Sequence, residues 1–169
     1  MSGDHVDGLL ADWARERPDL DTAPFAVVTR IRRAAALLEA AVDAALAPLG
    51  LTWGALDVLA TLRRAGPPYQ RSPTALYSAA LRSSGSMTNR IDRLERAGLV
   101  ARTPDPGDRR GVLVALTPAG LALVDRALEA HRATAERLLA ALPAADRPPL
   151  AALLRALLLG LEAPPPAGR

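Results

Sequence analysis

Arginine side chains able to contact nucleic acid gather in two nearby stretches of the sequence. The stretch SMTNRIDRLERAG carries Arg90 and Arg93, and the stretch DPGDRRG carries Arg109 and Arg110. A guanidinium group is planar and stays charged, so it can bind guanine or phosphate through two hydrogen bonds at once. Residues 82–110 hold seven arginines and four acidic residues, an excess that equals the net charge of +3 for the whole chain. This concentration of charge favours a polyanionic partner.

The pattern around these residues predicts a helix, a hairpin and the start of another helix. Ser83 or Ser84 can cap the first helix by accepting hydrogen bonds from its free N–H groups. Residues 99–103 and 112–116 read as two strands joined by the charged turn. Thr117, with proline after it, supplies an N-cap and a favourable first helical residue. A helix with a polar outer face followed by a basic-tipped hairpin predicts a winged helix-turn-helix that meets DNA.

The composition excludes several kinds of site. Half of the 169 residues are apolar and only 3% are aromatic, which favours one domain whose core is packed from helices. The chain has no cysteine, so disulfides, thiolate metal sites and thiol redox switches are excluded. Its two histidines, His5 and His131, have no neighbours at ligand spacing, and we expect His131 to be exposed or structural. We therefore expect no metal and no cofactor.

The two ends of the chain predict a cytoplasmic protein that does not enter a membrane. The N-terminus is acidic and has no apolar core of the kind found in signal peptides. The longest apolar run, residues 150–161, is interrupted by Arg155 and is too short to span a bilayer.

Helical patterns account for most of the remaining sequence. The predicted elements are a helix capped by Asp4 that ends before Pro18, helices over residues 24–47, 52–65 and 72–81, a short strand over 69–71, and helices over 118–142 and 150–162, the last with Asp146 before it as a cap. The long terminal helices carry more apolar surface than one small winged domain can cover. They therefore predict a helical dimer interface.

This interpretation divides the chain into four parts. Residues 1–50 and 118–162 supply the dimerisation lobe, and residues 51–117 form the winged helix-turn-helix lobe that binds DNA. Residues 163–169 form a disordered tail. The predicted fold class is all-α with a small β wing, dimerised through the N- and C-terminal helices.

Three sequence blocks, SMTNRIDRLERAGLV, DPGDRRG and VLVALTPAG, resemble the MarR family of bacterial transcriptional regulators when found in this order between long helices. The resemblance covers about residues 24–162. It implies a homodimer that binds a short pseudo-palindrome in double-stranded DNA, usually as a repressor released by a ligand. The residues then expected at the DNA are Ser84, Ser86, Thr88, Asn89, Arg90, Arg93, Asp108, Arg109 and Arg110.

An additional N-terminal helix makes the chain resemble the urate-responsive, HucR/PecS-like branch of that family. In that branch, four residue types define a pocket for an anionic purine between the dimerisation and DNA-binding lobes. The matching residues here are Trp13 in the N-terminal helix, Asp57 in WGALDVLATL, Arg90 on the recognition helix and Arg102 on the first wing strand. The resemblance implies urate, another purine or a different aromatic acid as the effector.

Several of the residues expected at the DNA or the ligand also have a simpler role that the sequence leaves open. Trp13 could pack in the core, and Asp57 could be a surface acid paired with a nearby arginine. Asn89 and Arg93 could belong to a solvated helix face, and the hairpin tip that contains Asp108 could contact nothing.

Two other classes of function are less consistent with the sequence. A protein-interaction module that had lost DNA binding would be expected to lose the polar recognition face, yet polar side chains remain from Ser86 to Arg93. An enzyme is disfavoured because the sequence has no phosphate-binding glycine loop and no usefully spaced carboxylate pair. We therefore predict a ligand-responsive, sequence-specific repressor that is not an enzyme.

Overall fold

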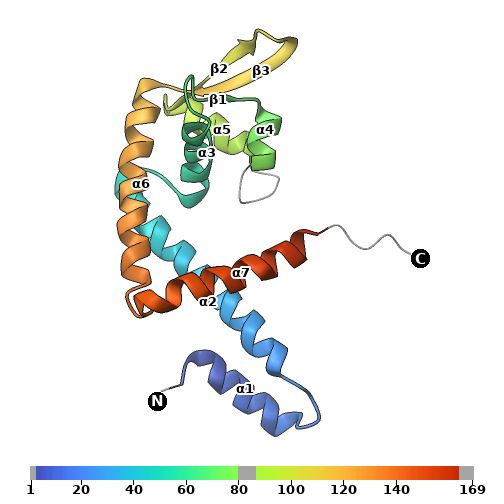
Figure 1. Ribbon diagram of the computed structural model, residues 1–169. Coiled ribbons are helices and arrows are strands. Elements are labelled where there is room, and N and C mark those ends of the chain that lie inside the picture. Colours follow the sequence, from blue (N-terminus) through green and yellow to red (C-terminus); the bar gives the residue numbers. More distant parts are fainter. Residues whose placement is uncertain (1–2, 80–86, 164–169) are drawn as a thin grey trace, which may run out of the picture. The chain divides into compact units, whose positions relative to one another are not determined.

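The computed structural model describes residues 3–79 and 87–163, apart from the side chain of Arg109 (Figure 1). The described elements are α1 (His5–Glu16), α2 (Ala23–Leu46), the 3₁₀ helix η1 (Ala47–Leu49), α3 (Trp53–Arg64), β1 (Gln70–Arg71), α4 (Pro73–Ala79), α5 (Met87–Arg96), β2 (Val100–Asp105), β3 (Asp108–Leu116), α6 (Pro118–Leu138), the 3₁₀ helix η2 (Ala144–Asp146) and α7 (Arg147–Glu162). The predicted class, all-α with a small β wing, is confirmed. The expected cap at Ser83 or Ser84, the expected contact at Ser86 and the end of the tail lie outside the described residues.

Side-chain caps begin several helices where the sequence predicts them. Asp4 accepts hydrogen bonds from the N–H groups of Val6 (2.8 Å) and Asp7 (3.0 Å), while the Asp7 carboxylate accepts one from the Asp4 N–H (2.7 Å). Thr52 begins α3 by accepting from the Ala55 N–H, and Ser72 and Thr117 make the corresponding bonds at α4 and α6. These bonds satisfy N–H groups that have no partner inside the helix.

Two predicted helix boundaries near the C-terminus are wrong. Helix α6 ends at Leu138 rather than near Leu142, and the following turn is closed by the Arg147 guanidinium, which donates to the carbonyls of Leu139 (3.0 Å) and Leu142 (3.3 Å). Helix α7 begins at Arg147 rather than Leu150, because prolines are tolerated in a first turn, where their missing N–H is not needed. The predicted side-chain cap by Asp146 is absent.

The wing is a three-stranded antiparallel sheet with strand order β1-β3-β2. The short strand expected at residues 69–71 is present as β1 and pairs Gln70 with Ala115. In the hairpin, Arg102 pairs with Val114, and the last pair joins Asp105 to Asp108. The connecting turn is therefore shorter than the predicted DPGDRRG, because both ends of that segment belong to the strands.

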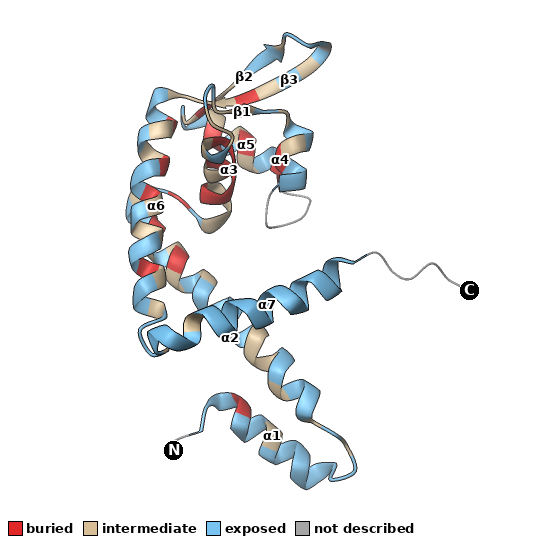
Figure 2. Ribbon diagram, in the orientation of Figure 1, coloured by how far each residue is buried: buried red, intermediate tan, exposed pale blue. Residues whose placement is uncertain are grey.

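The hydrophobic core lies around α3, α5 and the sheet (Figure 2). Three leucines of α3 at helical spacing, Leu56, Leu59 and Leu62, are at most 2% exposed. Ile91 and Leu94 bury the inner side of α5 in the same cluster. Burial of this apolar surface supplies the main favourable free energy of folding and orients the two helices.

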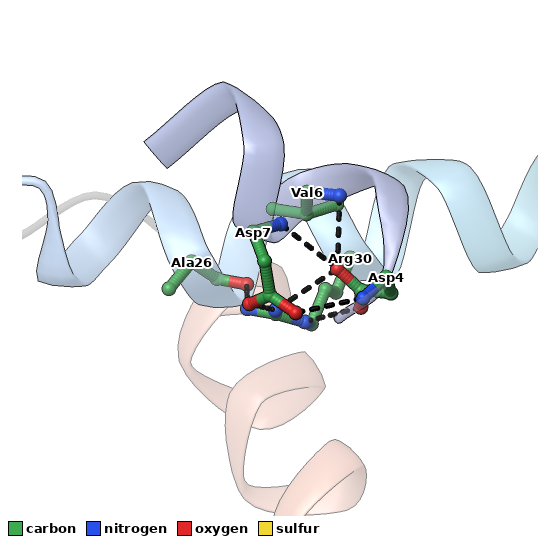
Figure 3. Close-up of polar contacts among 5 residues, drawn as sticks. All are labelled: Asp4, Val6, Asp7, Ala26 and Arg30. Atoms are coloured by element: carbon green, nitrogen blue, oxygen red, sulfur yellow. Dashed lines mark hydrogen bonds and ion pairs between the residues drawn. The ribbon is translucent and has the colours of Figure 1, made fainter. Parts of the chain in front are cut away.

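Arg30 attaches α1 to α2 (Figure 3). Its Nε donates to Asp4 Oδ2 at 2.8 Å and its Nη2 donates to Asp4 and Asp7, while Nη1 donates to the Ala26 carbonyl within α2. The hydrogen bond from Arg30 is the largest cause of the lowered pKa of Asp4. Val6, 1% exposed, packs at the same point, so polar and apolar contacts together fix the start of α1.

The chain forms two compact units, residues 1–134 and 135–169. In the first unit, α2 leaves large apolar side chains exposed, including Val27 and Leu38, whereas Val42 is buried. In the second unit, none of the residues of α7 is buried. The exposed leucines of α7 are Leu150, Leu153, Leu154, Leu157, Leu158, Leu159 and Leu161.

No single helix in the described part of the chain is both long enough and apolar enough to cross a membrane. The segments 23–49 and 53–64 meet such criteria only as a pair bent by 76°, on length and composition alone.

Candidate nucleic-acid interface

Helix α5 separates its apolar residues from its polar ones. Met87, Ile91 and Leu94 are buried on its inner side. Asn89, Arg93 and Arg96, spaced four and three residues apart, are exposed and share one face, and Thr88 is exposed beside them. The predicted polar outer face is therefore present and also includes Arg96, which is not among the residues expected at the DNA.

The end of α5 is joined to the start of α6 by backbone contacts. The chain leaves α5 through Gly98, whose φ of 70° is in the left-handed region that favours glycine. The Thr117 hydroxyl donates to the Gly98 carbonyl (2.7 Å), and the Thr117 N–H donates to the Leu99 carbonyl (3.1 Å). These bonds connect the recognition helix, the first wing strand and α6 at one point.

The tip of the wing is shaped by its aspartates. The Asp105 carboxylate accepts a hydrogen bond from the Gly107 N–H (2.8 Å), and the Asp108 carboxylate accepts one from the Arg110 N–H (2.9 Å). Arg110 is exposed, and Arg109 belongs to β3, although its side chain is not among those described. Asp108 thus has a structural role in the turn, and Arg110 remains available to a partner.

Arg90 lies on α5 but is turned toward α3. A Cβ atom placed on Gly54 would lie 3.0 Å from the Arg90 Nε and 3.1 Å from its Cζ, so the guanidinium packs against that glycine. Its Nη1 is buried and has no hydrogen-bond partner among the described residues. An unsatisfied buried donor is costly, so this atom is the candidate anchor for an anion.

Asp57 lies one helical turn after Gly54 in α3 and is only 5% exposed. The surface position that the alternative role of Asp57 requires is therefore wrong, while its pairing with an arginine stays a prediction. The structure places Asp57 and Arg90 on two helices that contact each other.

The other two expected ligand residues have different surroundings. Trp13 is 43% exposed on α1, so it is not part of the core of a single chain. Arg102 is paired with two carboxylates of α5: its Nη2 donates to Asp92 Oδ1 at 2.6 Å, and its Nη1 donates to Glu95. These contacts raise the pKa of Arg102, chiefly through the hydrogen bond to Asp92.

His131 packs against Trp53 of α3, with ring centroids 4.8 Å apart and planes inclined by 48°. Its Nδ1 is buried without a hydrogen-bond partner among the described residues. The sequence predicts no role for Trp53 and an exposed or structural one for His131. The contact supports the structural role, and no local pattern could have found it, because the two residues are far apart in the sequence.

Comparison with known proteins places these features in a family. The sequence model of the MarR family matches residues 51–112, which include α3, α4, α5, β2 and most of the hairpin. The HTH-type transcriptional regulator PecS of Dickeya dadantii is 40% identical over 126 residues, covering 75% of this chain and 76% of PecS.

Solved structures show the same fold. A mutant of MarR from Escherichia coli in complex with operator DNA superposes with a TM-score of 0.73 at 28% identity, covering 82% of this chain and 98% of that one. BpsR of Bordetella bronchiseptica superposes with a TM-score of 0.72 at 30% identity, covering 82% and 94%. The BpsR structure concerns regulation of its DNA binding by 6-hydroxynicotinic acid.

Proposed function

Because the chain belongs to the MarR family of transcriptional regulators, we propose that it is a repressor that binds a pseudo-palindromic operator as a homodimer and is released by a small anionic or aromatic molecule. The observation that carries the proposal is the outer face of α5, where Asn89, Arg93 and Arg96 are exposed opposite a buried apolar side. A helix of this kind beside a basic hairpin has the shape and charge to enter a major groove.

In this proposal the recognition helix reads bases and the wing contacts the DNA backbone. Thr88, Asn89 and Arg93 lie in the major groove, and the DNA contacts expected of Ser84 and Ser86 stay predictions. Arg109 and Arg110 reach the adjacent minor groove or its phosphates, where a narrow groove attracts guanidinium groups. Arg90 and Asp108, both in the expected DNA set, act indirectly through α3 and the hairpin turn. Such a regulator is expected in the cytoplasm, with the DNA.

The exposed apolar faces support the homodimer. Neither α7 nor the first half of α2 covers its large apolar side chains within the described residues. Exposed apolar faces of this kind are characteristic of interfaces, and two copies of the chain related by a two-fold axis would bury them. Two recognition helices related by that axis then read half-sites about one helical turn apart, roughly 10 base pairs.

The effector proposal rests on Trp13, Asp57 and Arg90 and on the similarity to PecS. Arg102, the fourth residue of the expected ligand set, is held by Asp92 and Glu95 and is not needed for this proposal. Arg90 supplies a buried guanidinium N–H without a partner, which suits an anion. Trp13 supplies an exposed flat ring, which suits an aromatic body. Asp57, if ionised beside the ligand, would repel an incoming anion and help to convert binding into movement of α3. Urate is the first candidate, and another purine or an aromatic acid is the alternative.

Ligand and DNA would oppose each other through Arg90. Because this residue belongs to the recognition helix, a ligand that captures its guanidinium also displaces the DNA-reading face. If ligand weakens DNA binding by some factor, DNA must weaken ligand binding by the same factor.

The DNA-binding part of the proposal is tested by selection. The full chain is used to select sequences from a library of random duplexes, and the enriched duplex is compared with a scrambled duplex of the same length and composition. We expect enrichment of a pseudo-palindrome. Failure to enrich any sequence would exclude a sequence-specific regulator.

The effector part is tested by titrating urate into the complex with the selected duplex and by calorimetry without DNA. We expect release of the duplex and direct binding of urate. Direct binding should be weakened by Arg90→Gln and Trp13→Ala but retained in Arg15→Gln, a matched control on the exposed side of α1. If millimolar urate neither binds nor releases DNA, while another aromatic acid does, the purine assignment is wrong and the general one stands.

A further inference from the structure

Arg102 links the wing to the recognition helix. It lies in β2, two residues after the strand begins, and its side chain crosses to Asp92 and Glu95 of α5. The backbone also takes part, since the Arg102 N–H donates to Glu95 Oε1 at 3.3 Å. Glu95 therefore receives hydrogen bonds from both the main chain and the side chain of one residue.

The contacts of Arg102 with Asp92 and Glu95 form a brace between a strand and a helix. Asp92 and Glu95 are three residues apart and share a face of α5, so the guanidinium bridges one full helical turn. Arg102 pairs across the hairpin with Val114, which is fully buried in the core. The backbone of Arg102 is thus fixed by the sheet, and its guanidinium holds α5.

The three side chains are partly shielded from solvent, with exposed fractions of 32% for Arg102, 41% for Asp92 and 37% for Glu95. An isolated surface ion pair contributes little to stability, but a guanidinium held by two carboxylates is geometrically specific. We therefore expect the contribution of this link to lie in orientation more than in the free energy of unfolding.

The link also has an electrostatic consequence. Asp92 and Glu95 are the two acidic side chains on a helix that is otherwise basic at its surface. Free carboxylates beside DNA would repel the phosphates, and the Arg102 guanidinium offsets their charge. A role limited to this neutralisation and a role in orientation predict different responses to removal of the carboxylates.

We propose that Arg102 is a positioning residue that fixes the angle between the recognition helix and the wing, and thereby sets the selectivity of the protein for its operator over other DNA. The inference rests on the proposed DNA-binding function. Base readout requires side chains to be placed within a fraction of an ångström, whereas contact with phosphates tolerates small rotations. Loss of the brace should therefore reduce operator binding more than binding to unrelated DNA.

The experiment compares dissociation constants for the selected duplex and for the scrambled duplex, measured by fluorescence anisotropy. The variants are Arg102→Gln, Arg102→Lys and the double variant Asp92→Asn/Glu95→Gln, with Arg17→Gln as a control that removes an exposed pair with Asp19 in a different part of the fold. Circular dichroism establishes that each variant is folded. The quantity of interest is the dissociation constant for the scrambled duplex divided by that for the selected duplex, which measures selectivity for the operator.

Arg102→Gln should lower this ratio about tenfold, and Arg102→Lys, which keeps the charge but loses the planar fork, should lower it less. The double variant discriminates between the roles, because it removes two negative charges while keeping Arg102. If Arg102 acts by orienting α5, the double variant should bind the scrambled duplex more tightly, and the ratio should fall about tenfold. If Arg102 only neutralises the two carboxylates, the double variant should bind both duplexes more tightly, and the ratio should stay unchanged.

The inference is overturned if the folded Arg102→Gln and double variants keep the ratio within twofold of the unaltered protein. In that case the unaltered protein still discriminates between the two duplexes, so the proposed function survives. If the unaltered protein itself shows no preference, the proposed function and this inference are both overturned.

Discussion

The carbonyl oxygen of Leu99 lies against the backbone of Gly120, so closely that a Cβ atom on residue 120 would be 1.9 Å away from it. This contact brings the first turn of α6 onto the segment that leaves the recognition helix. Together with the bonds from Thr117 to Gly98 and Leu99, it makes the junction a close-packed joint. The position of α5 therefore depends on a site outside the DNA-facing surface.

Replacing Gly120 with alanine should destabilise the protein. The added methyl group meets backbone rather than a flexible side chain, so the joint must open, at a cost of roughly 1–3 kcal/mol or more. Urea unfolding followed by circular dichroism measures this change. Gly8→Ala in α1 is the matched control, because a Cβ there would have nothing within 4 Å, and alanine favours a helix by about 1 kcal/mol. Equal stability of Gly120→Ala and the unaltered protein would contradict the close packing.

The ion pair between Arg30 and Asp4 should be visible as a pH effect. Hydrogen bonding to Arg30 lowers the pKa of Asp4 below its ordinary value of 3.8. The group therefore contributes stability that is fully present above that value and is lost as the pH falls through the lowered pKa. An NMR titration of the Asp4 carboxyl should show the pKa rising in Arg30→Gln. The same pKa in both proteins would show that the pair does not persist in solution.

The exposed leucines of α7 should hold two chains together. Leu157→Glu combined with Leu161→Glu places two charges on a face that we expect to be buried by a partner, and each buried leucine contributes about 1.5–3 kcal/mol. Light scattering should show a dimer for the unaltered protein and a shift to monomer for the variant. Arg155→Glu on the same helix controls for a change of charge alone. If light scattering shows that the unaltered protein is a monomer, this interface is excluded.

The secondary structure followed from local signals, whereas the side-chain partners did not. Asp4, Thr52 and Thr117 begin helices because a short polar side chain can accept hydrogen bonds from N–H groups two or three residues ahead. Such residues can be recognised from the sequence alone. The three inward leucines of α3 follow from helical spacing in the same way.

The pairings that define the site depend on the tertiary fold. Arg30 and Asp4 are 26 residues apart, and Arg102 meets Asp92 across a change from helix to strand. The resemblance predicts that Arg90 and Arg102 belong to one ligand site. In the structure, Arg90 is turned toward α3 and Arg102 is paired with carboxylates of α5. An arginine side chain is long enough to reach several partners, so its type and position do not determine which one it selects.

The central claim is that α5 and the wing form a DNA-reading surface, and the affinity for the selected duplex as a function of salt concentration tests it most directly. Arg93→Ala should cost on the order of 1–3 kcal/mol of binding free energy at every salt concentration, as expected for a lost base contact. Arg110→Ala should weaken binding to all sequences and make the dependence of affinity on salt shallower by about one unit, as expected for a lost phosphate contact. Arg17→Ala, outside this surface, should change neither quantity. If Arg93→Ala and Arg110→Ala both bind with unchanged affinity and unchanged salt dependence, α5 and the wing are not the surface that meets DNA.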